Sequence, residues 1–201
     1  MSKSSFTAII TCHENIDELK EFINHFKEQT YTPDEFLIYV SGVDNILDID
    51  LGFNSSDNFK VIPCDNFNDW GHRKRRQGIK DASCEFLGFF NPDELFVKDY
   101  IQKLLSQTRE ADFVYCNYVG KRRKTGEPWL VYSSLENIPR GPSGLGGMIT
   151  IDVFIVKSSL AKKVGYPEVN KYTGDWAFIG AVTAPPCRVS HVEEFLVVRK
   201  P

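Results

Sequence analysis

Three largely apolar runs lie in the first half of the chain, at residues 6–10, 36–40 and 86–90. Short apolar runs of this kind are typical of strands buried on both faces of a sheet. After the first run, Asn15 and Glu18 have the spacing of a capping box, which predicts that a helix begins there. Apolar residues then recur with the helical period, at Ile16, Leu19, Phe22, Ile23 and Phe26. We expect this helix to end near Thr30, before Pro33.

A strand, a helix and a second strand in this order form a right-handed βαβ unit, so the strands are expected to be parallel. Further strands are predicted at 60–62 and 113–115, and helices at 71–82 and 100–105. Residues 44–60 are polar and lack a clear period, which indicates a loop with room for one short helix. The predicted fold class is therefore α/β, with a mostly parallel central sheet flanked by helices.

The pattern changes in the second half of the chain. Two turn-rich segments, 121–128 and 139–147, precede a strand predicted at 148–156 and a short helix capped by Ser158. No repeat or low-complexity tract divides the chain. We therefore predict one domain over residues 1–201, in which 1–118 and 119–201 form two halves.

Composition and charge narrow the class of protein. The net charge of −3 does not supply the broad positive field of a general nucleic-acid binder, so a nucleic-acid partner is not expected. The cysteines form no Cys-x-x-Cys pair, which predicts reduced thiols in a cytoplasmic protein: Cys12, Cys64, Cys84, Cys116 and Cys187. The sequence shows no secretory signal and no apolar stretch near the ~20 residues that cross a bilayer, so we expect a soluble or peripheral protein.

The turn after the third apolar run carries the clearest chemical signal. Asn91, Pro92, Asp93 and Glu94 follow the predicted strand at 86–90 directly. In open α/β sheets ligands bind at such strand ends, and a carboxylate there can hold Mg²⁺ or Mn²⁺ together with substrate phosphates. The alternative is an ordinary turn that leads into the next helix.

Segments in the same order resemble the family 2 glycosyltransferases, which have the GT-A fold of nucleotide-diphospho-sugar transferases. The resembling segments are 6–14, 36–44, 71–78, 85–94, 147–156 with 164–168, 174–176 and 191–199. Each match is weak alone, but their order and spacing agree with the βαβ prediction.

The resemblance implies roles for particular residues. Asn91 and Asp93 match the family's metal motif, and His191 matches a histidine that can complete the metal site. Asp175 matches the catalytic base. The substrate-binding residues that it implies are Thr11, His13, Glu14, Ser41, Asp44, Arg75 and Arg199, of which the arginines face the diphosphate. Trp129, among turn residues, and Trp176 are candidate acceptor or sugar contacts, although Trp70, Trp129 and Trp176 could equally be core residues.

The implied reaction is inverting transfer of a sugar from a nucleoside-diphosphate sugar, with a UDP-sugar favoured, to an acceptor hydroxyl. Asp175 would take the hydroxyl proton, while the metal and the arginines stabilise the leaving diphosphate. Three residues depart from the family pattern. Ser41 replaces an aspartate that recognises uracil, Asn91 replaces the first metal-motif aspartate, and Gly174 replaces the glutamate before the base.

Other interpretations remain open from the sequence alone. Asp175 could stabilise the dipole of a helix at 176–182, and His191 could be a strand histidine bonded to the backbone. The basic run 121–124 fits a charged hairpin tip or a site that attracts an anionic acceptor. A catalytically degenerate sugar-nucleotide-binding protein with the same fold is the main rival. A nucleotidyltransferase is less favoured, because no glycine-rich loop follows the first strand.

Overall fold

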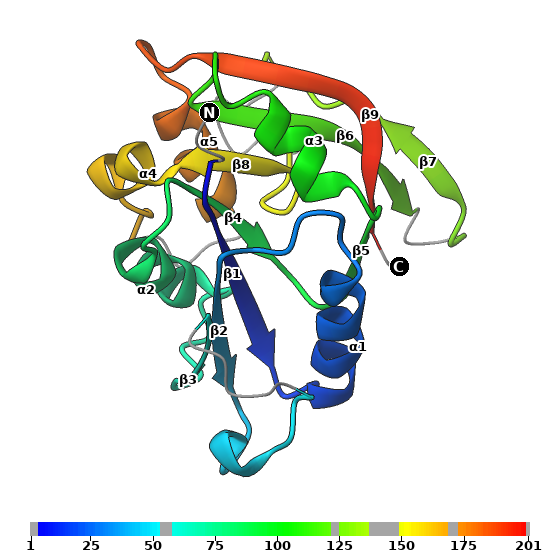
Figure 1. The fold of residues 1–201 in the computed structure, drawn as a ribbon, viewed down its shortest axis with the longest axis vertical. Coiled ribbons are helices and arrows are strands. Elements are labelled where there is room, and N and C mark those ends of the chain that lie inside the picture. Colours follow the sequence, from blue (N-terminus) through cyan, green and yellow to red (C-terminus); the bar gives the residue numbers. More distant parts are fainter. Residues whose placement is uncertain (1–3, 53–57, 122–124, 137–148, 169–172, 200–201) are drawn as a thin grey trace.

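One mixed β-sheet runs through the computed structural model, which describes residues 4–52, 58–121, 125–136, 149–168 and 173–199. Its strand order is β3-β2-β1-β4-β8-β6-β9-β5, and β7 pairs with β6 (Figure 1). The architecture, with helices around a central sheet, confirms the predicted α/β class, but the prediction of a mostly parallel sheet is wrong, because half of the strand pairings among the described residues are antiparallel. None of the helices in the described ranges is long and apolar enough to cross a membrane.

The first four strands along that order are parallel, as the βαβ pattern predicts. They are β1 (Phe6–His13), β2 (Glu35–Ser41), β3 (Phe59–Pro63) and β4 (Phe86–Phe90). Ile9 pairs with Leu37 of β2 on one side and with Phe89 of β4 on the other. The carboxyl ends of β1 and β4 therefore lie next to each other at one edge of the sheet.

Beyond β4 the sheet becomes mixed. It continues through β8 (Phe154–Lys157), β6 (Phe113–Lys121), β9 (Val189–Arg199) and β5 (Glu94–Phe96), with β7 (Pro128–Val131) beside β6. β8 is antiparallel to both β4 and β6, whereas β6 and β9 are parallel. The parallel arrangement thus belongs mainly to the first half of the chain, and β7 is a strand that the sequence pattern did not reveal.

The helices are α1 (Ile16–Lys27), α2 (His72–Asp81), α3 (Tyr100–Ser106), α4 (Ser158–Val164) and α5 (Gly174–Val182), with a 3₁₀ turn η1 (Ile46–Asp48). The predicted cap at Asn15 is confirmed, because the Glu18 N–H donates to Asn15 Oδ1 at 3.2 Å. The reciprocal bond of a capping box is replaced, since Glu18 Oε2 accepts from Asn15 Nδ2 at 2.8 Å while the Asn15 backbone N–H donates to His13 O.

Adjacent residues of β4 point to opposite faces of the sheet and organise two aromatic clusters. Phe90 contacts Phe26 of α1 and Tyr100 of α3. Phe89 contacts Phe154 of β8 and Phe178 of α5. Period-two alternation in a strand that is apolar throughout explains why helices cover both faces at β4.

The strand predicted at 148–156 is wrong over residues 149–153, where the chain forms a turn before β8 begins at Phe154. The Val153 N–H reaches Thr150 O, and the Tyr100 hydroxyl donates to Asp152 O at 2.9 Å. Residue 148 lies outside the described residues, as do the turn-rich segment 139–147 before it and residues 122–124 of the basic run. The predicted Ser158 cap is also wrong, because Ser158 is already the first residue of α4 and its side chain makes no capping hydrogen bond.

The five cysteines are free thiols, in agreement with the sequence prediction of no disulfide framework.

Candidate functional site

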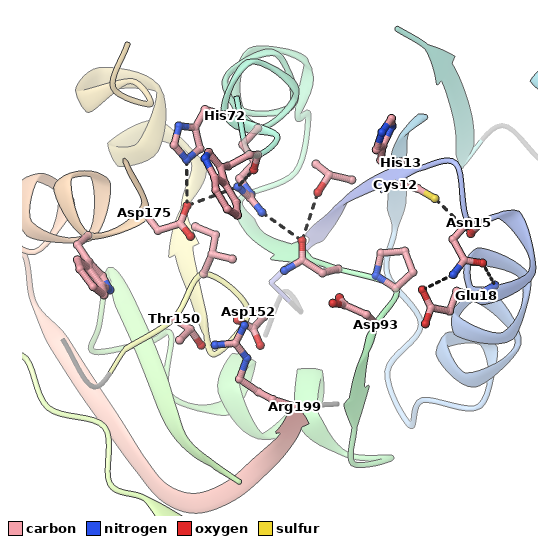
Figure 2. A pocket seen from close by; sticks show the side chains of 17 residues that line it. Cys12, His13, Asn15, Glu18, His72, Asp93, Thr150, Asp152, Asp175 and Arg199 are labelled. Atoms are coloured by element: carbon pink, nitrogen blue, oxygen red, sulfur yellow. Dashed lines mark hydrogen bonds and ion pairs between the residues drawn. The ribbon is translucent and has the colours of Figure 1, made fainter. Parts of the chain in front are cut away.

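A cavity of about 690 Å³ opens at the carboxyl ends of β1 and β4 (Figure 2). β1 contributes Thr11 to its wall, and the turn after β4 contributes Asn91 and Asp93. The remaining walls come from Trp70, from the starts of α1, α2 and α5, from the turn at 150–152 and from the last residue of β9. The cavity therefore lies at the sheet edge where the sequence predicted a ligand site.

Eight of the predicted site residues line this cavity: Thr11, His13, Arg75, Asn91, Asp93, Asp175, Trp176 and Arg199. Residues from both halves of the chain thus meet in one place. The separation between Thr11 and Arg199 in sequence shows that only the tertiary fold can assemble this group.

The other five predicted site residues lie outside the lining of this cavity: Glu14, Ser41, Asp44, Trp129 and His191. Ser41 is buried behind the wall, where its hydroxyl accepts a hydrogen bond from Lys74 Nζ at 2.6 Å. Glu14 is exposed and lies 3.4 Å from His13. Asp44 lies in the exposed loop before η1. Trp129 lies on β7, packed over Gly120.

His191 is held by neighbours on β6. Its ring stacks on Tyr115 with centroids 4.4 Å apart, and Nε2 is 2.9 Å from Asn117 Oδ1. His191 does not line the cavity that Asp93 lines, because the pairing of β6 with β9 places its ring against Tyr115. This placement matches the alternative of a strand histidine satisfied within the fold, although its partner is a side chain.

Arg75 connects three parts of the site. Nη1 donates to Trp70 O at 2.8 Å and approaches Asp175 Oδ1 at 3.4 Å, while Nη2 donates to Asn91 Oδ1 at 3.1 Å. Burial opposes the charge of Arg75, but Asp175 and Tyr166 outweigh it and raise the pKa of the guanidinium. A permanent positive charge therefore lies beneath the cavity.

Asp93 is exposed toward the cavity and forms no side-chain hydrogen bond or ion pair within the part of the chain that the structure describes. Asn91 differs, because its Oδ1 already accepts hydrogen bonds from Thr11 and Arg75. The described residues contain no group of three or more His, Cys, Asp or Glu side chains suited to a metal ion. Asp93 therefore fits Mg²⁺ or Mn²⁺ only as one ligand beside substrate phosphates, which is the usual arrangement for Mg²⁺ in phosphate-transfer sites.

Asp175 lies in the first turn of α5, and its side chain remains 26% exposed. The Tyr166 hydroxyl donates to Oδ1, and Arg75 and His72 approach the same oxygen. The carboxylate is thus fixed from one side and open to the cavity on the other. Helix first turns favour a negative charge at such a position.

Two buried acidic residues, Glu94 and Asp152, lie beside Arg199 and were not predicted as site residues from the sequence. Arg199 Nε donates to Glu94 Oε1 at 2.9 Å, and the fully buried Asp152 lies near it on the cavity wall. Burial and the charge of Asp152 raise the pKa of Glu94 to about 8 although Arg199 opposes the shift. Burial also raises the pKa of Asp152.

Asp152 was missed because it was assigned to a strand. A lone acidic residue within the apolar run 148–156 was the signal that could have found it, since buried carboxylates are rare unless they are paired. Both Asp152 oxygens and the Thr150 hydroxyl lack a hydrogen bond with good geometry among the described residues. The Thr150 hydroxyl is nevertheless near enough to counteract part of the rise in the Asp152 pKa.

A smaller cavity of about 420 Å³ adjoins the first and shares Thr11, His13 and Arg75 with it. Its floor includes Lys74, whose ammonium donates to Cys12 O at 2.8 Å. Trp70 stands between the two cavities, and its indole is 69% exposed. The two cavities therefore adjoin along the residues that line both of them.

The family model described as "Glycosyl transferase family 2" matches residues 7–166. No curated protein matches the chain significantly in sequence. The match spans β1 to β4, α2, the turn at 91–94 and the segment up to Tyr166.

Solved structures of TarS from S. aureus have the same fold. The fragment TarS 1–349 superimposes with a TM-score of 0.71 at 17% identity, over 98% of this chain and 60% of that one. Its complex with UDP gives 0.72 at 16% identity, over 96% and 60%. Its complex with UDP-GlcNAc gives 0.71 at 17% identity, over 98% and 58%. The chain thus spans about three fifths of the length of that fragment.

Proposed function

The chain belongs to glycosyl transferase family 2, and from this premise we propose that it is an inverting, metal-dependent glycosyltransferase. Its donor is a nucleoside-diphosphate sugar, with a UDP-sugar favoured, and its acceptor carries a hydroxyl group. The observation that carries this proposal is the arrangement of Arg75, Asp93 and Asp175 around a single cavity. The TarS complexes with UDP and UDP-GlcNAc support a donor of this class.

The diphosphate of the donor is proposed to bind between Asp93, Arg75 and Arg199. A Mg²⁺ or Mn²⁺ ion held by Asp93 and the phosphates would supply positive charge for the leaving group. The two arginines add fixed positive charge where negative charge develops on the departing oxygen. The nucleoside would extend into the smaller cavity beside Lys74 and Trp70, which leaves the sugar facing Asp175.

Asp175 acts as the general base in this mechanism. The acceptor hydroxyl attacks the anomeric carbon on the face opposite the diphosphate, and its proton passes to the Asp175 carboxylate. The bond from the anomeric carbon to the phosphate oxygen breaks, and its electron pair leaves with the diphosphate. Attack from the opposite face inverts the configuration at the anomeric carbon.

The two halves of the chain divide this work in the proposal. Residues 1–118 provide most of the donor site, and residues 119–201 provide the base and the acceptor side. Trp176, which lines the cavity next to Asp175, replaces Trp129 as the better-placed acceptor contact. Free thiols at all five cysteines are compatible with the proposed cytoplasmic location.

A catalytically degenerate sugar-nucleotide-binding protein is the second candidate. Asn91 favours it, because its oxygen is engaged by Thr11 and Arg75 and its amide carries no negative charge for a cation. Both candidates bind the donor, so only turnover separates them.

The test is release of UDP from UDP-glucose, UDP-galactose and UDP-GlcNAc, with and without Mn²⁺, first with water and then with simple sugars and polyols as hydroxyl acceptors. We expect Asp93→Ala and Asp175→Asn each to abolish release, while Asp175→Asn leaves UDP binding in calorimetry nearly unchanged. Asp17→Asn, an exposed site on α1, is the matched control and should retain wild-type release. Binding of UDP-sugars without any release by the wild-type protein would establish the degenerate alternative.

A further inference from the structure

Gly174 leaves a space beside the proposed base that the His72 ring fills. A Cβ atom built on Gly174 would lie 2.3 Å from His72 Cε1 and 2.8 Å from each ring nitrogen. These separations are shorter than a carbon atom tolerates, so no other residue fits at 174 while His72 stays in place. The glycine is therefore required by its neighbour.

His72 is firmly packed. Its side chain is almost completely buried at the start of α2, and its ring lies 5.4 Å from the Tyr166 ring. From this position Nε2 lies 3.8 Å from Asp175 Oδ1 (Figure 2). A polar ring is thus held beside the carboxylate, in the wall of the same cavity.

The contacts of Asp175 are unequal between its two oxygens. The Tyr166 hydroxyl and Arg75 Nη1 donate hydrogen bonds to Oδ1, whereas His72 Nε2 lies 3.8 Å from it, beyond hydrogen-bond distance. Within the described residues Oδ2 takes part in no hydrogen bond or ion pair, and the side chain is 26% exposed. Hydrogen-bond donors around one oxygen fix the plane of a carboxylate and leave the electron pairs of the other available.

We propose that His72 is a positioning residue for Asp175: in the space left by Gly174 it helps to hold Oδ1, so that Oδ2 receives the proton of the acceptor hydroxyl. This inference rests on the proposed function, since it assigns a task to the partner of the proposed base. The O–H bond of the acceptor breaks toward Oδ2 as the new bond to the anomeric carbon forms, and the diphosphate leaves with its electron pair. His72 itself touches no substrate.

The packing part of the proposal is tested by thermal unfolding of four proteins: wild type, Gly174→Ala, His72→Ala and the double variant. Gly174→Ala should lower the melting temperature of the wild type by several degrees because its methyl group meets the His72 ring. In the His72→Ala background the same change should cause no loss, since the space is then open and alanine favours a helix. Equal losses in both backgrounds would overturn the inference.

The functional part uses His72→Phe, which keeps a ring but lacks Nε2, and His72→Gln, which keeps a hydrogen-bonding group. UDP release from the best UDP-sugar should fall about tenfold or more in kcat for His72→Phe, with KM and UDP affinity within about twofold. His72→Gln should recover part of kcat. The matched control is His25→Gln, at an exposed site on α1, which should match the wild type.

The outcomes separate this inference from the function on which it rests. An active wild type with unchanged kcat in His72→Phe overturns the role of His72 alone. A rise in KM at constant kcat overturns it too, because the effect would then lie on donor binding. A wild-type protein that releases no UDP from any of the sugars overturns both proposals.

Discussion

The buried carboxyl group of Glu94 predicts how the stability of the protein changes with pH. This group lies beside Asp152 and Arg199, and its pKa is raised from 4.5 to about 8. In the unfolded chain this group ionises near the ordinary value for glutamate. Between these two pH values the folded protein holds a proton that the unfolded chain has lost. Stability must therefore decrease as the pH rises from about 4.5 to about 8 and level off above that.

The size of the effect follows from the difference between the two pKa values. At about 1.4 kcal/mol per pKa unit, a rise from 4.5 to about 8 corresponds to at most about 5 kcal/mol of stability lost over this range. The Glu94→Gln variant carries no titrating group but keeps an oxygen to accept from Arg199 Nε. We expect its stability to vary less with pH than that of the wild type, and to exceed it at pH 8–9.

Urea unfolding at pH 5, 6, 7, 8 and 9 measures this difference. Asp112→Asn is the control, because hydrogen bonds from Arg188 lower the pKa of Asp112 and its ionised form stabilises the fold. This stabilisation decreases only when the pH falls below the ordinary pKa of an aspartate. Asp112→Asn should therefore lower the free energy of unfolding by the same amount at every pH from 5 to 9. Parallel curves for Glu94→Gln and the wild type between pH 5 and 8 would refute the reasoning.

Two further predictions concern buried positions. Burial raises the pKa of Cys12 to about 11, so about one thiol in a thousand is ionised at pH 8. Iodoacetamide should therefore modify Cys12 far more slowly than a free cysteine. Mass spectrometry of the Cys12 peptide measures this rate, and rapid labelling would contradict the prediction. Gly78→Ala should lower the free energy of unfolding by about 1–3 kcal/mol, because its Cβ would lie 2.6 Å from Ile9 Cγ2 between α2 and β1; unfolding at the wild-type denaturant midpoint would show that the helix moves away at little cost.

The parallel half of the fold could be predicted because its signals are local. The runs at 6–10, 36–40 and 86–90 are apolar on both faces, and that pattern fits few structures other than central strands. The capping box at Asn15 depends on residues three positions apart, which interact wherever the helix packs. Such signals need no knowledge of distant contacts.

The irregular parts of the site could not be predicted in the same way. An apolar run such as 149–156 fits a strand or any other buried segment, and only its contacts with Tyr100 and β6 show that it turns at Asp152. The position of His191 depends on the register between β6 and β9, which includes bulges near Asn117. No local sequence pattern pointed to His72, because its proposed role depends on its contacts with Gly174 and Asp175, about a hundred positions away.

The place of β9 in the sheet has a consequence for incomplete chains. β9 lies between β6 and β5 instead of at a border, and it carries Arg199 into the cavity. Until residues 189–199 have emerged from the ribosome, β6 lacks its neighbour on one side and β5 lacks the strand with which it pairs among the described residues. Exposed strand edges of this kind promote association between chains. Interrupted translation products are therefore expected to be cleared or to aggregate, and not to sequester donor sugar from complete molecules.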